Sequence, residues 1–180
     1  THFVTGQTAL ISLAGPANKQ GRIAADNICG GNSHFHGSQG SSVLKLFGLT
    51  AASTGINEKA AQAAGIAYDK VVLFPASHAA YYPGARSMAM KVLYEKESLR
   101  LLGAQIVGGE GVDKRIDVLA TAIRAKMTAL ELTELDLSYA PPYSSAKDPV
   151  NMAGFMIEDL ESGKVRQFHW NEVEDLPCDG

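Results

Sequence analysis

Two apolar stretches separated by a short polar segment constrain the fold of this 180-residue chain more than any other feature. Every second residue of the first stretch, 87–94, is apolar or aromatic: Met88, Met90, Val92 and Tyr94. The polar segment 95–98 can form a turn, and residues 99–107 make a second β-rich stretch. Alternation at period two is typical of a strand with one buried face. The sequence therefore predicts that the two stretches pair as a β-hairpin.

A helix is predicted to follow the hairpin over residues 112–127. Its apolar residues have the spacing of one buried helical face: Val112, Ile116, Leu119, Ala120 and Ile123. Asp113 in the first turn suits the positive end of the helix dipole. Thr128 and Glu131 have the spacing of a capping box, which predicts one more short helix. Strands before helices, with a hairpin at the centre, predict an α+β domain with helices packed on an antiparallel sheet.

The glycine-rich segment 108–111 joins the second predicted strand to this helix. Its spacing matches neither the dinucleotide-binding fingerprint nor the P-loop, and Glu110 would repel a phosphate. We interpret it as a tight strand-to-helix turn.

The N-terminal part of the chain is predicted to contain one helix. Residues 1–15 hold two short apolar stretches around Gly6, which predict a hairpin or paired extended segments. Pro16 suits the first position of a helix that ends at the glycines 30–31. Gly21 lies in mid-helix, where it either permits close packing or is tolerated slack. Residues 32–42 predict a loop or linker.

Between this linker and the hairpin, the sequence predicts three further elements. An apolar stretch, 43–49, opens the second part of the chain. Asn57 is suited to cap a short alanine-rich helix that ends at Gly65. Residues 68–77 are β-rich and predict a strand.

Composition favours a soluble globular domain. Hydrophobic residues make up 46% of the chain, which is enough for a core. A formal net charge of -3 without a long basic run disfavours nucleic acid and anionic membranes as partners. No apolar run approaches the roughly 20 residues that cross a bilayer, and no leader pattern opens the chain. We expect a cytoplasmic protein.

The cysteines and histidines do not indicate a metal site. Cys29 and Cys178 are far apart, and we expect Cys29 to be a buried thiol near a helix end. His34 and His36 lie in a predicted loop without nearby metal-ligating residues, so we expect them to be solvated. We therefore predict no bound metal.

Five short segments resemble one family of flavin-dependent reductases. In chain order they are GPANKQGR with AADNI (15–28), ASTG (52–55), YYPGA (81–85), GEGVDKRIDV (109–118) and YAPPYSSAKDPVN (139–151). They resemble the C-terminal part of FAD-dependent pyridine nucleotide–disulfide oxidoreductases of the coenzyme A-disulfide reductase and NADH oxidase-like group. The matches extend from about residue 13 to residue 155.

The resemblance implies a domain organisation. Residues 1–35 would be the end of an FAD-binding domain, 36–155 a dimerisation domain, and 156–180 an extension or linker toward a rhodanese-like domain. The full-length enzyme would be a homodimer that uses FAD and NAD(P)H to reduce a coenzyme A-type disulfide, persulfide or polysulfide. This segment is expected to bind neither cofactor alone and to be inactive alone, because it has no glycine-rich fingerprint and no cysteine in the expected context.

The resemblance also implies two catalytic tyrosines. Tyr139 would lie beside the flavin and the redox cysteine of the partner subunit, where a phenol can donate a hydrogen bond to a sulfur leaving group. Tyr81 would lie near the substrate sulfur, with Tyr82 as the adjacent alternative. Simple packing in a proline-rich corner is the other interpretation of these side chains.

Further contacts follow from the same resemblance. Leu13 and Ala14 would lie along the flavin at the start of the first helix. Asn18 and Lys147 would contact the substrate, an amide suiting the pantetheine group and an ammonium suiting a phosphate. The neighbouring residues 114–115, a lysine and an arginine, are expected at the surface or in a dimer contact.

Other functions stay open. The chain can be a non-catalytic dimerisation or ligand-binding module, or, within the family, part of an NADH oxidase or peroxidase. Ser77 and His78 suggest a hydrolase only weakly, because adjacent residues in a strand point to opposite faces.

Overall fold

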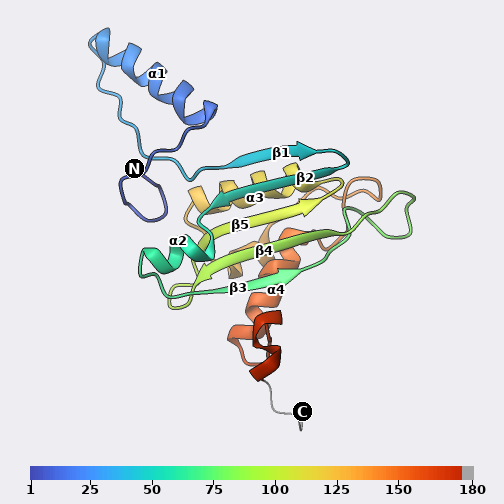
Figure 1. The fold of residues 1–180 in the computed structure, drawn as a ribbon. Helices are drawn as coiled ribbons and strands as arrows, with labels where there is room; N and C mark the ends of the chain where they lie inside the picture. The colour runs from blue at the N-terminus through green and yellow to red at the C-terminus, as the bar shows by residue number, and fades with distance from the viewer. Residues whose placement is uncertain (176–180) are drawn as a thin grey trace.

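The computed structural model describes residues 1–175, and its centre is one five-stranded antiparallel sheet (Figure 1). The strands are β1 (Ser42–Leu46), β2 (Leu49–Gly55), β3 (Tyr68–Leu73), β4 (Met88–Glu95) and β5 (Leu101–Gly108). They lie in the order β1-β2-β5-β4-β3. The predicted hairpin is confirmed, since β4 pairs with β5 from Met88 opposite Gly108 to Tyr94 opposite Leu101. The pairing of β2 with β5 joins a second hairpin, β1–β2, to it.

The main core lies between this sheet and two helices, α3 (Val112–Arg124) and α4 (Pro149–Glu161) (Figure 1). Core residues come from both layers: Val71, Met90, Val92, Ile106, Ile116, Leu119, Val150 and Ile157. The alternating residues of β4 and the apolar face of α3 meet here, as their periodicities predict. The α+β class with helices packed on an antiparallel sheet is confirmed.

Two short helices lie within these layers, one between two strands and one between α3 and α4. Asn57 caps α2 (Glu58–Ala63) by accepting a hydrogen bond from the Ala60 N–H at 2.9 Å, and Gly65 follows the helix with φ of +68°, as predicted. The Thr128 and Glu131 side chains make the predicted reciprocal contacts at the start of η1 (Leu130–Glu134), which is a 3₁₀ helix. A second 3₁₀ helix, η2 (Trp170–Asp175), ends the described chain.

Helix α1 (Ala14–Ile28) projects away from the sheet and has no buried residue (Figure 1). The helix begins earlier than predicted, so Pro16 occupies the third helical position and not the first. Proline is tolerated there because the N–H groups of the first turn have no acceptor within the helix. A Cβ added to Gly21 would meet no atom within 4 Å, which fits tolerated slack and not close packing.

Two predictions for this region are wrong. Among the described residues, 1–13 form no strand, because a turn with Gly6 at φ of +69° joins the His2 N–H to the Gln7 carbonyl at 2.8 Å. Cys29 is exposed and not buried, because α1 packs against no other layer. Cys178 lies outside the described residues.

Helix α4 was not predicted, although its N-terminus has clear capping residues. Asp148 accepts a hydrogen bond from the Val150 N–H at 3.0 Å, and the Asn151 side chain accepts one from the Asp148 N–H at 3.2 Å. Pro149 occupies the first helical position, where proline is favoured. The helix continues through residues 155 and 156, and the predicted domain boundaries stay predictions.

Within residues 1–175, no helix is both long and apolar enough to cross a bilayer.

Candidate functional site

Two tyrosines that lie 58 residues apart in the sequence meet at one end of the sheet. The hydroxyl oxygens of Tyr81 and Tyr139 are 2.8 Å apart. Tyr81 comes from the loop between β3 and β4, and Tyr139 from the loop between η1 and α4. Both side chains are exposed, and the hydrogen bond with Tyr81 raises the pKa of Tyr139 above its usual value. The tyrosine pair (Tyr81 and Tyr139) therefore presents a protonated phenol to whatever lies against it.

Tyr82 faces a different neighbour. Its ring packs edge-on against the buried His78 ring, with the centroids 5.7 Å apart and the planes at 79°. Of the two adjacent tyrosines, Tyr81 is thus the one whose hydroxyl meets Tyr139. Ser77 Oγ accepts a hydrogen bond from the Arg86 N–H at 3.1 Å and so closes the β3–β4 loop, which carries Tyr81 and Tyr82.

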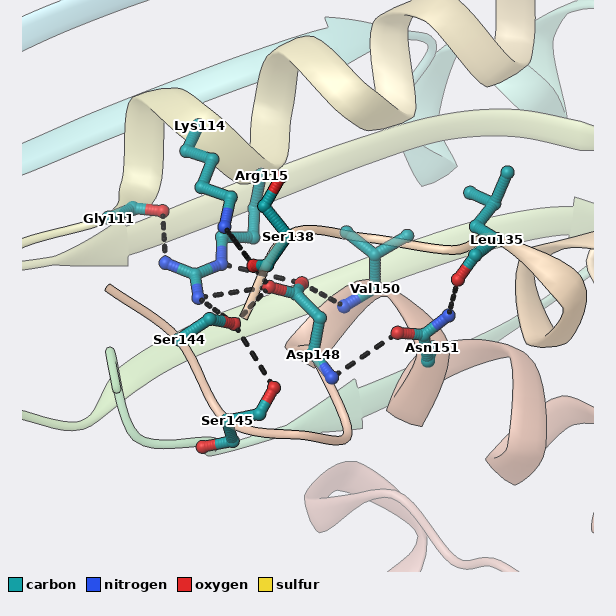
Figure 2. Close-up of polar contacts among 10 residues, drawn as sticks. All are labelled: Gly111, Lys114, Arg115, Leu135, Ser138, Ser144, Ser145, Asp148, Val150 and Asn151. Carbon is teal, nitrogen blue, oxygen red and sulfur yellow. Dashed lines mark hydrogen bonds and ion pairs between the residues drawn. The ribbon is translucent and has the colours of Figure 1, made fainter. Parts of the chain in front are cut away.

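A buried charged network joins the start of α3 to the loop of residues 136–148, which we call the Tyr139 loop (Figure 2). The Arg115 guanidinium donates to the Asp148 carboxylate at 3.0 Å and to the Ser144 hydroxyl at 3.1 Å. Ser144 in turn donates to Asp148 at 2.6 Å. None of the three residues is more than 2% exposed. We call this set the Arg115 network (Arg115, Ser144 and Asp148).

The Arg115 network keeps Asp148 ionised. Burial by itself raises the pKa of the Asp148 carboxyl, but hydrogen bonds from Ser144 and the Val150 N–H, together with the Arg115 charge, outweigh it and lower the pKa below its usual value. Because every buried polar atom of the network has a partner, the ion pair can be tolerated in the interior.

Gly111 explains why the turn before α3 is glycine-rich. Its φ is +70°, and its carbonyl accepts a hydrogen bond from Arg115 at 3.1 Å. A Cβ on Gly111 would lie 2.1 Å from Arg115 Nη1. The segment 108–111 is therefore the tight strand-to-helix turn that we predicted, and it leaves room for the guanidinium.

Sequence reasoning misplaced Arg115. The prediction of a surface or dimer-contact position is wrong, because Arg115 is 1% exposed inside its own chain. It lies three residues after Val112 and four before Leu119, and therefore on the buried face of the helix, which was a usable signal. Its neighbour Lys114 is about one-third exposed and reaches the Ser138 carbonyl at 3.4 Å and Asp148 at 3.8 Å.

The other predicted site residues do not join the tyrosine pair within one chain. Lys147 is exposed, with Nζ 5.6 Å from the centre of the Phe155 ring. Leu13 is the N-cap of α1, and Ala14 and Asn18 are exposed on that helix. Figure 1 shows α1 at the opposite end of the sheet from the loop that joins β3 to β4.

A cleft of about 900 Å³ separates α1 from α3. Residues from α1, the linker and α3 line it, among them Pro16, Arg22, His34, His36 and Arg124. Both histidines are exposed, as predicted. Within residues 1–175, no three His, Cys, Asp or Glu side chains are grouped closely enough to hold a metal ion.

Comparison with known proteins gives one consistent result. The pyridine nucleotide-disulphide oxidoreductase dimerisation domain matches residues 42–149. A coenzyme A disulfide reductase of Staphylococcus epidermidis is 40% identical over 151 residues, which is 83% of this chain and 34% of the relative. The chain thus spans about a third of the length of the curated relatives that it matches.

Two solved structures are similar over nearly the whole chain. The reduced CoADR-RHD of Bacillus anthracis has 48% identity and a TM-score of 0.93, and an NAD-dependent persulfide reductase from A. fulgidus has 42% identity and the same TM-score. Each match covers 97% of this chain and 32% of the solved chain.

Proposed function

Because the chain belongs to the pyridine nucleotide-disulphide oxidoreductase family through its dimerisation domain, we propose that it is part of an NAD(P)H-dependent disulfide reductase. The substrate is a coenzyme A disulfide or a persulfide or polysulfide, as the names of relatives at 40–48% identity suggest. The observation that carries the proposal is the tyrosine pair, two phenols joined at 2.8 Å and exposed at one end of the sheet. This chain contributes that pair to the active site of its partner.

Homodimer formation is supported by the β1–β2 hairpin. Its apolar residues lie on the surface of a single chain: Val43, Leu44, Leu46, Phe47 and Leu49. Several large apolar side chains exposed on one hairpin are typical of an interface. A dimer built through this domain can bring α1 of one subunit toward the tyrosine pair of the other, which would unite the two separate sets of predicted site residues.

In the proposed reaction, Tyr139 acts on sulfur. Its phenol stays protonated, donates a hydrogen bond to the thiolate or sulfur leaving group, and can deliver the proton that this group takes up. Tyr81 lies near the substrate sulfur and holds the Tyr139 hydroxyl in place through their shared hydrogen bond. Tyr82, Asn18 and Lys147 contact the substrate, the ammonium suiting a phosphate and the amide suiting a pantetheine group.

FAD and NAD(P)H supply the electrons in the full-length enzyme. The start of α1 fits a flavin contact, because Leu13 provides no side-chain cap and the N–H groups of the first turn are free to face an electron-rich ring edge. Leu13 and Ala14 would lie against that ring. We do not expect this chain by itself to retain either cofactor.

An alternative is a dimerisation or ligand-binding module without catalysis, which the family match to the dimerisation domain alone favours. An NADH oxidase or peroxidase of the same family is a further alternative. The disulfide reductase, the non-catalytic module and the oxidase or peroxidase would share this fold. The role of the tyrosine pair is therefore what distinguishes them.

A hybrid-dimer experiment tests the proposal. One full-length subunit carries Tyr139→Phe, and the other lacks its flavin-side redox cysteine. If Tyr139 acts in the partner's site, the hybrid has one intact site and recovers about half of the wild-type coenzyme A-disulfide reduction. If Tyr139 acts in its own subunit's site, or if the chain is not part of a reductase, the hybrid recovers nothing.

The Tyr139→Phe homodimer should lose on the order of 100-fold in kcat, as expected for a lost proton donor. Tyr143→Phe is the matched control, because Tyr143 is an exposed tyrosine of the same loop. Equal activity of the Tyr139→Phe and Tyr143→Phe enzymes would remove Tyr139 from the mechanism.

A further inference from the structure

We infer that Arg115 is a positioning residue for the tyrosine pair: it clamps the loops that carry Tyr81 and Tyr139 to one buried point at the start of α3. This inference rests on the proposed function, because it assigns a role to a residue that touches neither tyrosine.

Ser144 is the point at which the two loops are joined. Its hydroxyl belongs to the Arg115 network, with Arg115 at 3.1 Å and Asp148 at 2.6 Å. Its carbonyl accepts a hydrogen bond from the Ala79 N–H at 2.9 Å, two residues before Tyr81. One fully buried residue therefore connects the guanidinium to both loops.

The start of the Tyr139 loop is held by Lys114, the neighbour of Arg115 on α3. Lys114 Nζ lies 3.8 Å from the Asp148 carboxylate and 3.4 Å from the carbonyl of Ser138, the residue before Tyr139. Figure 2 shows Lys114 and Arg115 reaching from α3 to both ends of this loop. The loop is thus fixed at residue 138 and at residues 144 and 148.

The rest of the loop has little to fix it. Residues 136–148 contain no helix or strand, and their internal backbone hydrogen bonds join Ala140 to Tyr143 and Ser144. The tyrosine side chains are exposed, so their own packing does not determine where the hydroxyls lie. A stable separation of 2.8 Å between two such hydroxyls therefore depends on how the two backbones are held.

Only an arginine can make this clamp as it stands. The guanidinium donates at once to Gly111, Ser144 and Asp148 from three different nitrogens. A lysine at position 115 has one charged nitrogen and cannot reproduce the planar fork. It keeps the positive charge beside Asp148, however, so Arg115→Lys separates geometry from charge.

The test measures kcat and KM in the full-length enzyme for Arg115→Lys, both in the wild type and together with Tyr139→Phe. A misplacement of a catalytic group by about 1 Å costs about 100-fold, so we expect Arg115→Lys to lower kcat by about 10-fold to 100-fold in the wild type. In the Tyr139→Phe enzyme the same change should lower kcat less than about two-fold, because residues that act as one unit are not additive. KM should change little in either enzyme.

The second readout is independent of turnover. A 3-fluorotyrosine at position 139 reports the environment of that ring by fluorine NMR. We expect one sharp resonance in the wild type and a broadened or split resonance in Arg115→Lys. Arg100→Lys is the matched control, since Arg100 is exposed immediately before β5, and it should leave both readouts unchanged.

Two results would separate failure of this inference from failure of the proposed function. Equal losses of kcat in the two backgrounds, with an unchanged fluorine resonance, would mean that Arg115 is merely structural. Full activity of Tyr139→Phe would overturn the proposed function, while the fluorine resonance would still decide whether Arg115 positions that ring.

If Arg115→Lys does not fold, Ser144→Ala takes its place. It removes the hydroxyl from the network but keeps the carbonyl that binds Ala79. The same dependence on Tyr139, with a smaller loss, would support the clamp, and equal losses in both backgrounds would overturn it.

Discussion

Replacing Arg115 by methionine would expose the energetic role of the buried ion pair. Methionine fills a similar volume but removes the nearer and buried counter-ion of Asp148, which is 2% exposed, and leaves the partly exposed Lys114 ammonium at 3.8 Å. Removing one partner of a buried pair costs about 3–5 kcal/mol. Asp148 keeps its hydrogen bonds from Ser144 and the Val150 N–H, so we expect a loss near the lower end, about 3 kcal/mol.

The loss should depend on pH in a defined direction. In the wild type the pKa of Asp148 is lowered, so its contribution to stability is present above the usual carboxyl pKa and disappears as the pH falls through the folded value. Without Arg115, its charge and its hydrogen bond no longer oppose the effect of burial, so we expect the pKa of Asp148 to rise. Protonation of Asp148 then removes the buried charge from the variant. The difference in free energy of unfolding between wild type and variant should therefore shrink as the pH falls from 7 to 5.

The assay is urea unfolding followed by circular dichroism at several pH values. Adding Asp148→Asn to Arg115→Met should recover much of the loss, because asparagine is neutral and still caps α4. If Arg115→Met lowers the free energy of unfolding by less than about 1 kcal/mol at every pH, Arg115 and Asp148 behave as a surface ion pair does, and the argument from burial is refuted.

Two further perturbations test other parts of the fold. Glu58 accepts from Lys70 at 2.5 Å and Lys91 at 2.8 Å; burial alone raises its pKa, but the two lysines together lower it to about 2. Because this pKa is depressed, Glu58→Gln should cost about 1 kcal/mol at pH 7, measured by urea unfolding, and the cost should vanish as the pH falls from 4.5 toward 2. Gly103→Ala should abolish the folded state in a thermal melt, because its Cβ would lie 1.9 Å from the Ile56 carbonyl oxygen, where two backbones meet; a native melting curve would contradict this.

Local sequence patterns were sufficient to predict several strands of the sheet and the first helix that packs on it. The alternation in 87–94 and the apolar face of 112–127 predicted β4 and α3, because burial of one face imposes a period on the sequence. The polar turn and the β-rich stretch 99–107 predicted β5. Asn57 and Gly65 predicted the ends of α2 for an equally local reason, since a cap contacts only its own first or last turn. The capping residues of α4 are an equally local signal, since Asp148, Pro149 and Asn151 all lie at its first turn.

The sequence indicated which residues form the candidate site but not how they are arranged. The family resemblance named Tyr81 and Tyr139, yet nothing in the spacing of residues 58 positions apart tells which hydroxyls meet. Helical spacing puts Arg115 on the buried face of α3, but an arginine is rarely buried without a partner, and its partner, Asp148, lies 33 residues away in the sequence.

The sequence alone therefore determined the α+β class, the central hairpin, the helix that follows it and the tight glycine turn, all of which depend on neighbours within a few residues. Only the tertiary structure decided the strand order, the exposure of α1, the pairing of the tyrosines and the pairing of Arg115 with Asp148. These features depend on contacts between distant segments, whose free energy is set by which surfaces the packed layers bury together and not by any local period.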